Sequence, residues 1–210
     1  MKRTYPVTVK LLSALHINGG TDVNGNRITL KMDQRPYVPA SLFKGLVREN
    51  FSKLWQLAFS DALPCCRSDK TDANPCRCMT CRMFGAAGFQ RSRVYFDHLE
   101  TSQTVEFRTC SNVSIDRHLH KNVEANLVFT EVAPPIAINE NGERETLMLN
   151  GNVTVYYPTE LDIAEQKKIE AVFVEAVRMI TNIGLGKSRG LGFAETRLNA
   201  PEGGWLCESE

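Results

Sequence analysis

The sequence predicts an α+β fold in which residues 1–210 form one domain, and two observations support this. Two long segments carry apolar residues at spacings of three and four, as amphipathic helices do, and shorter segments alternate apolar with polar residues, as half-buried strands do. These segments follow one another in the order β-α-β-β-α-β. With 42% apolar and 23% charged residues, the 210-residue chain can bury a core of its own.

Each element is predicted from its local pattern. We expect strands over residues 6–17, 92–100, 150–157 and 191–199, and helices over residues 40–59 and 160–184. Val7, Val9 and Leu11 carry the alternation of the first strand. Ser41 is the expected N-cap of the first helix, and Gly184 is expected to end the second.

This order of elements is the ferredoxin-like arrangement, in which two βαβ units share one sheet. Two segments do not belong to it. A cysteine-rich insertion over residues 60–83 follows the first helix, and a polar insertion over residues 105–147 separates the second strand from the third.

Net charge and hydropathy restrict the kind of nucleic-acid surface that the protein can have and the compartment in which we expect it. The net charge is only +1, so any nucleic-acid surface must gather its basic residues on one face. No apolar run approaches the roughly 20 residues that span a bilayer, and Lys10 interrupts the apolar N-terminal stretch in a way unlike a signal peptide. We therefore expect a cytoplasmic protein.

The cysteines predict a structural zinc site. Five of the seven lie within residues 65–81, where crowding favours a metal over disulfides in a reducing compartment. The expected zinc ligands are Cys66, Cys76, Cys78 and Cys81, with Cys65 as the alternative to Cys66. Free thiols and a redox C-x2-C pair are the other interpretations of this segment.

The segment "IGLGKSRGLGFAE", residues 183–195, combines glycines with a lysine, a serine and an arginine. A P-loop requires a strand before it and a helix after it, and a dinucleotide fingerprint requires the same context, but here a helix comes first and a strand follows. Two interpretations remain: a flexible turn, or a loop whose backbone approaches a polynucleotide.

Several motifs together resemble the RAMP (repeat-associated mysterious protein) superfamily of CRISPR effector subunits. They are "LHINGG", "YVPASLFKGLVRENF", "CMTCRMFG", "SRVYFDHLE", "SIDRHLHKNVEANLVFTEVAPP" and "IGLGKSRGLGFAE". The sequence is most similar to the backbone subunit of type III complexes. The resemblance implies a modified ferredoxin-like, RRM-like domain that stacks with other RAMP subunits along a CRISPR guide RNA, which pairs with a complementary target RNA.

The resemblance also implies where RNA is bound. The 105–147 insertion corresponds to the family's thumb, a hairpin that kinks the guide. With the basic residues of the chain, it gives the expected RNA contacts: His16, Ser41, Lys44, Arg48, Arg91, Arg93, Arg117, His118, Lys121, Gly186, Lys187, Ser188, Arg189 and Gly190. Contacts to phosphates hold RNA without reading its sequence, as a guide-holding protein requires.

Whether the chain also cleaves RNA is a separate question. Catalytic members of the family use an aspartate after the first strand together with a divalent metal such as Mg²⁺. Here Asn26 or Arg27 stands at that position, and Asp22 and Asp33 are the candidates to replace it. His120 joins His16 and His118 as candidates for metal-free cleavage. A subunit that caps the complex, or a scaffold without RNA contacts, is the remaining alternative.

Overall fold

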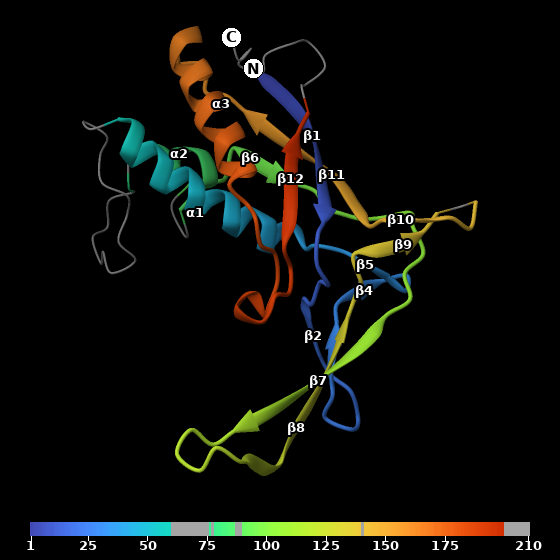
Figure 1. Cartoon of the computed structure of the whole chain (residues 1–210). Coiled ribbons are helices and arrows are strands. Elements are labelled where there is room, and N and C mark those ends of the chain that lie inside the picture. The colour runs from blue at the N-terminus through green and yellow to red at the C-terminus, as the bar shows by residue number, and fades with distance from the viewer. Residues whose placement is uncertain (60–75, 77, 87–89, 140, 200–210) are drawn as a thin grey trace.

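The computed structural model describes residues 1–59, 76, 78–86, 90–139 and 141–199. At its centre is an antiparallel sheet of four strands in the order β12-β1-β11-β6 (Figure 1). The strands are β1 (Lys2–Leu11), β6 (Val94–Phe96), β11 (Met148–Tyr156) and β12 (Ala194–Leu198). Helices α1 (Ala40–Ala58) and α3 (Ile163–Arg178) provide the crossovers, so the predicted ferredoxin-like arrangement is confirmed.

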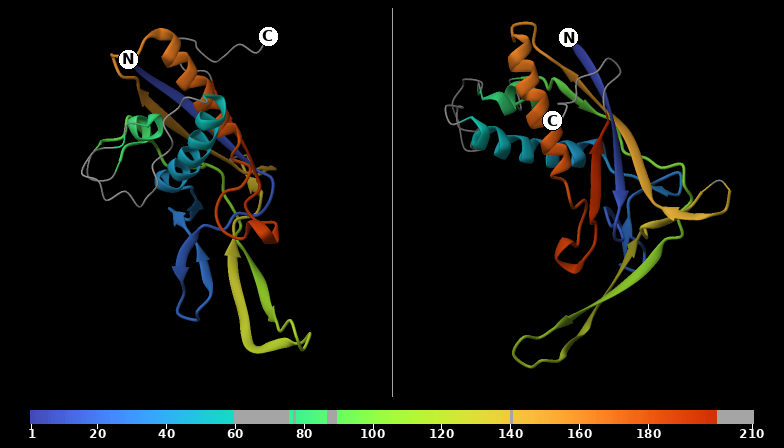
Figure 2. Two further views of the ribbon diagram at one scale, coloured as in Figure 1. Left: turned by 90° about the vertical axis from the view of Figure 1, so that its left-hand side faces the viewer. Right: turned by 45° about the horizontal axis from the view of Figure 1, so that its top comes forward.

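The two long helices pack on one face of this sheet (Figure 2). The buried side chains between them come from alternate strand positions and from one side of each helix: Tyr5, Val7, Val9 and Leu11 of β1, Phe43, Val47 and Phe51 of α1, and Ile169, Phe173 and Val177 of α3. The short helix α2 (Met79–Phe84) joins this core through Phe84, whose ring centroid lies 5.4 Å from that of Phe51. The helical and alternating spacings of the sequence therefore mark the core faces correctly.

The predicted N-cap of the first helix is wrong. Pro39 is the N-cap of α1 and provides no side-chain hydrogen bond, so Ser41 lies within the first helical turn. Its side chain is exposed to solvent. The rigid proline sets the backbone at the helix start, so no capping hydroxyl is used there.

The predicted end of the second long helix is also wrong. α3 ends at Arg178, six residues before Gly184. Beyond it, the chain bonds to β12 in place of a further helical turn: the Thr196 hydroxyl donates to the Ile180 carbonyl at 3.0 Å, and the Ala194 amide donates to the Thr181 carbonyl at 2.9 Å. Pairing with the last strand therefore ends the helix, because it occupies carbonyls that further helix would use.

The first strand starts earlier than expected and ends at Leu11 in place of residue 17. β1 pairs with β11 from Lys2 opposite Tyr156 onward. Beyond Leu11 the chain leaves the sheet, and Leu15 forms an isolated bridge with Ala133. The segment after β1 is thereby placed between the sheet and the insertions.

The segment after β1 and the 105–147 insertion together build a second sheet of strand order β2-β3-β8-β7. Its members are β2 (Asn18–Thr21), β3 (Arg27–Thr29), β7 (Arg108–Ile115) and β8 (Asn122–Val132). β7 and β8 form a long antiparallel hairpin that projects away from the central sheet (Figures 1 and 2). Two further pairs, β4 (Lys31–Met32) with β5 (Arg35–Pro36) and β9 (Ile136–Ile138) with β10 (Arg144–Thr146), lie near its base. No helix of the described chain is long and apolar enough to cross a membrane.

A buried polar cluster ties α3 to the central sheet. The Tyr5 hydroxyl donates to Glu170 Oε1 at 2.8 Å and lies 2.9 Å from the Tyr157 hydroxyl. Arg3 Nη1 lies 3.7 Å from the same carboxylate oxygen. Burial raises the pKa of Glu170, although the Tyr5 hydroxyl and the Arg3 charge act against this shift.

The raised pKa of Glu170 predicts a stability that falls with pH. Since the folded state binds this proton more tightly than the unfolded chain, the contribution is present below the unfolded pKa and is lost as pH rises through the folded pKa. Glu170→Gln keeps a hydrogen-bond acceptor for Tyr5 and removes this titration. Urea unfolding between pH 4 and 8 measures it: we expect a smaller decline in the free energy of unfolding for Glu170→Gln than for the native chain. Glu175→Gln, on the exposed side of the same helix, is the control, and equal declines in all three chains would contradict the assignment.

Candidate nucleic-acid interface

The glycine loop, residues 184–192, packs its backbone directly against the segment that follows β1. The Leu185 amide donates to the His16 carbonyl, and the Gly192 amide donates to the Ala14 carbonyl, each at 2.8 Å. Gly184 has a φ of +84°, and a Cβ there would lie 2.3 Å from the His16 carbonyl oxygen. No side chain fits at that distance, so glycine is required for the contact.

The middle of the loop is turned toward solvent. Lys187–Arg189 form one turn of 3₁₀-helix between two glycines, Gly186 and Gly190, that both adopt the left-handed conformation. The side chains of Lys187, Ser188 and Arg189 are exposed, and nothing lies within 4 Å of the Cβ position of Gly190. The loop therefore presents two cations, a hydroxyl and an uncovered stretch of backbone on one short turn.

Two neighbours define the surroundings of this turn. Arg189 Nη1 donates to Asn112 Oδ1 of β7 at 3.4 Å, so the loop meets the middle of the first hairpin strand. On the other side, the positive charge of Lys187 contributes to holding the pKa of Glu49 on α1 below its ordinary value, after the larger effect of the Lys53 ammonium. The loop thus lies between the hairpin and α1.

The predicted basic residues of α1 are placed differently from one another. Lys44 is half-buried, and burial, followed by the nearby Arg48 charge, lowers its pKa. The Arg48 guanidinium donates to Cys81 Sγ at 3.8 Å. Arg48 therefore links α1 to the cysteine cluster, a contact that charge patterning alone did not predict.

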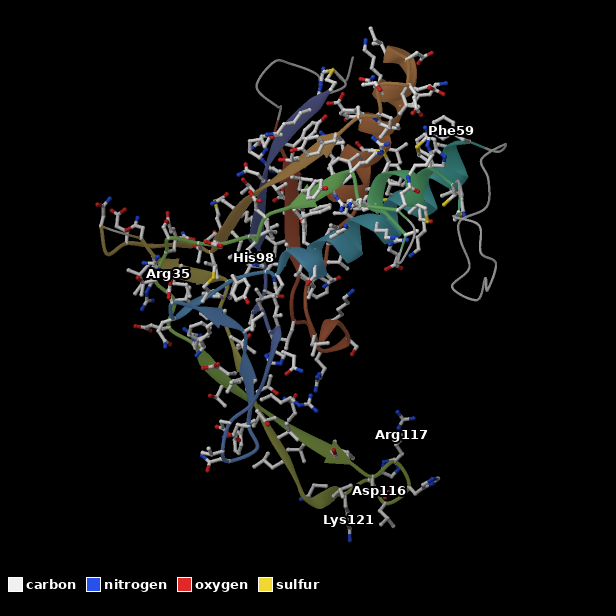
Figure 3. All side chains as sticks on the ribbon, turned by 180° about the vertical axis from the view of Figure 1, so that it is seen from behind. Arg35, Phe59, His98, Asp116, Arg117 and Lys121 are labelled. Carbon is white, nitrogen blue, oxygen red and sulfur yellow. The ribbon has the colours of Figure 1, made fainter. Side chains whose placement is uncertain are left out.

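The predicted RNA-binding residues of the hairpin lie at its tip, away from the glycine loop (Figure 3). Arg117, His118 and Lys121 are exposed there. Asp116 shapes the turn, because its Oδ1 accepts hydrogen bonds from the amides of His118 and Leu119, and these bonds lower the pKa of its carboxyl group. The cationic tip is thus held by a local turn.

His16, unlike Lys187, Arg189 and the basic residues at the hairpin tip, is buried. Its side chain is 2% exposed, and its Nδ1 lies 2.8 Å from the Glu131 carbonyl oxygen. Its Nε2 is buried without a hydrogen-bond partner in the described part of the chain. Burial lowers the pKa of His16, and the charges of Arg27 and Arg189 add to that shift. The ring is therefore enclosed beneath the glycine loop, and its predicted contact with RNA stays a prediction.

The two candidate catalytic aspartates occupy separate turns. Asp22 closes the β2–β3 turn: its Oδ1 accepts from the amides of Asn24 and Asn26, and its Oδ2 accepts from the Asn26 side chain at 2.9 Å. The Asn26 side-chain bond is the main cause of its lowered pKa. Asp33 lies between β4 and β5 with a positive φ of 49°. A catalytic role for either carboxylate stays a prediction.

Arg91 and Arg93 lie at the opposite end of the central sheet from the glycine loop. The Arg93 carbonyl accepts from the Tyr156 amide at 2.8 Å, and Tyr156 pairs with Lys2 at the start of β1. The glycine loop contacts the chain beyond the other end of β1. The structure therefore separates these two arginines from Lys187 and Arg189 of the glycine loop.

Three cysteines come together where the sequence predicts zinc. The Sγ atoms of Cys76, Cys78 and Cys81 lie within 4.8 Å of one another. Cys78 is the N-cap of α2, and its sulfur accepts from the Cys81 amide at 3.4 Å, as in a tight knuckle. Three converging thiols suit Zn²⁺, which takes four soft ligands in a tetrahedron. Cys65 and Cys66, the candidates for the fourth ligand, fall outside the described residues.

The cysteine cluster predicts about one zinc ion per chain. We expect elemental analysis of the purified protein to find it, and Cys81→Ser to lose most of it because one of the three converging sulfurs is removed. Cys110→Ser, at an exposed cysteine on β7, should keep the metal. Native protein with less than about half an equivalent of zinc would contradict the assignment.

Comparison with known proteins agrees with this geometry. No curated protein matches the chain. The family model of the RAMP superfamily matches residues 8–195, from β1 through the glycine loop to β12. The chain thus belongs to the RAMP superfamily, whose members are CRISPR-associated RNA-binding subunits.

Proposed function

We propose that this chain is a guide-RNA-binding backbone subunit of a type III-like CRISPR effector complex, acting in antiviral defence in the cytoplasm. One observation carries the proposal: the glycine loop presents Lys187, Ser188 and Arg189 to solvent between α1 and strand β7 of the hairpin. This arrangement offers charge and close backbone approach to the phosphates of a single strand.

The chemistry of the loop suits holding RNA more than reading it. Lysine and arginine side chains bind phosphate oxygens of any nucleotide, and a turn uncovered at Gly190 lets the RNA backbone approach closely. No base-specific contact is needed at this site. A guide held in this way keeps its bases available for a complementary target RNA.

The hairpin supports an assembly role. Its strands and tip carry apolar side chains that water covers in the single chain: Val113, Ile115, Leu119, Leu127 and Phe129 are 38–69% exposed. The tip adds the cations Arg117 and Lys121. Apolar surface beside cations suits a place where RNA and a neighbouring subunit are held together. We assign the hairpin to contacts with the guide and with the next RAMP subunit.

The proposal predicts that the loop cations set both RNA affinity and its salt dependence. Lys187→Ala combined with Arg189→Ala removes two phosphate-binding charges, so we expect weaker binding to single-stranded RNA. We also expect the slope of log affinity against log salt to shrink by roughly 1.4, since each single-strand phosphate contact contributes about 0.7. Fluorescence anisotropy at several salt concentrations measures both quantities.

The matched control is Arg144→Ala combined with Arg178→Ala, which changes the net charge equally at two exposed arginines on β10 and α3. It should leave affinity and slope close to native. Equal losses in both double variants would show that only overall charge matters. Unchanged binding in the loop variant would favour a capping or scaffold subunit whose loop contacts protein alone.

A further inference from the structure

A pocket on the central sheet lies apart from the glycine loop. It has a volume of about 400 Å³ and opens at the start of β6. The residues that line it are Gln90, Arg91, Ser92, Arg93, Tyr95 and Tyr156. A single nucleotide is of this size, at the lower end of the range for small-ligand sites.

The pocket lies on the face of the sheet that α1 and α3 leave uncovered. Val94, Val153 and Val155 point into the core beneath the helices, so their neighbours along each strand point the other way. Tyr95 pairs with Thr154, and Thr154 Oγ1 contacts Thr4 Oγ1 at 3.1 Å on this open face. Pocket and helices are therefore on opposite sides of the sheet.

Two half-exposed aromatic rings form one wall. Tyr95 is 53% and Tyr156 is 42% exposed. Their centroids are 5.5 Å apart and their planes meet at 83°, so neither ring stacks on the other. The ring that points its edge at its partner keeps its faces open, and a nucleobase can stack there.

The charged residues that line the pocket are basic. Arg91 and Arg93 contribute two guanidinium groups, and none of the lining residues that the structure describes is acidic. Lys2 pairs with Tyr156 in the same cross-strand row and adds a third cation beside the pocket. A guanidinium binds a phosphate through two parallel hydrogen bonds, so the cations suit an anion next to the stacked ring.

We propose that this pocket binds a nucleotide, with the base on Tyr95 or Tyr156 and the phosphate at Arg91 and Arg93. β1 spans roughly 30 Å between Lys2 and Leu11, and the glycine loop contacts the chain beyond Leu11. This site is therefore distinct from the guide-binding surface. Its ligand is either one residue of a single-stranded RNA or a free nucleotide.

Isothermal titration of the full chain with AMP, adenosine and inorganic phosphate tests the base and phosphate halves separately. We expect AMP to bind more tightly than either part. Of Tyr95→Ala and Tyr156→Ala, the variant that removes the stacking ring should weaken AMP at least about fivefold, the lower end of the stacking effect, while phenylalanine at the same position keeps it. Arg93→Ala should weaken AMP and leave adenosine unchanged. Lys10→Ala, a cation at the far end of the same open face, is the control.

A short adenosine oligomer identifies the source of the ligand. If it binds more tightly than AMP and loses affinity in Tyr156→Ala, the site takes an RNA strand; if AMP binds as well as the oligomer, it takes a free nucleotide. The Lys187→Ala and Arg189→Ala double variant should bind AMP normally. The proposed nucleotide site and the proposed guide-binding surface are therefore tested independently of each other.

Equal AMP affinity in the native chain, Tyr95→Ala and Tyr156→Ala, with circular dichroism showing all three folded, would overturn the proposal. So would loss of a protein partner in Tyr156→Ala with nucleotide binding unchanged, because the face would then be a protein contact.

Discussion

The contact between the glycine loop and the segment after β1 is the constraint on which the functional surface depends. At Gly184 and Gly192 the backbone approaches neighbouring carbonyls so closely that a Cβ would lie 2.3 Å and 2.0 Å away. Hydrogen bonds from the backbone amides of Leu185 and Gly192 to the segment after β1 hold the loop at both ends. The turn Lys187–Arg189 is consequently presented on a rigid base, so its backbone costs little entropy to order when RNA binds.

The ferredoxin-like core positions the hairpin sheet, the cysteine cluster and the pocket relative to that contact. β1 lies inside the sheet, and the chain beyond it supports the glycine loop and the hairpin sheet. α1 links the core to the cysteine cluster through the contact between Arg48 and Cys81. Because both long helices cover one face, the other face stays open, and there the pocket with its tyrosines and arginines lies. The chain thus offers two cationic surfaces despite a net charge of only +1.

Local patterns in the sequence predict the core well, because burial follows helix and strand periodicity directly. Features that depend on distant contacts are harder to predict. α3 ends at Arg178 because β12 bonds the following carbonyls, and no local signal reports such pairing. The Tyr5–Glu170 bond joins residues far apart in sequence and carries no motif. In the sequence, Arg91 and Arg93 look like part of one basic track with Lys187 and Arg189. The strand register shows that the two pairs lie at opposite ends of β1. The cysteine cluster was predictable because its ligands are neighbours in the chain.

Photo-crosslinking of the assembled complex, followed by mass spectrometry of the crosslinked peptides, tests directly whether the glycine loop binds guide RNA. We expect crosslinks on residues 184–192, together with crosslinks at the tip of the β7–β8 hairpin near Arg117. Crosslinks absent from the glycine loop but present elsewhere on the chain would contradict this assignment, because the turn between α1 and the hairpin would then face protein or solvent.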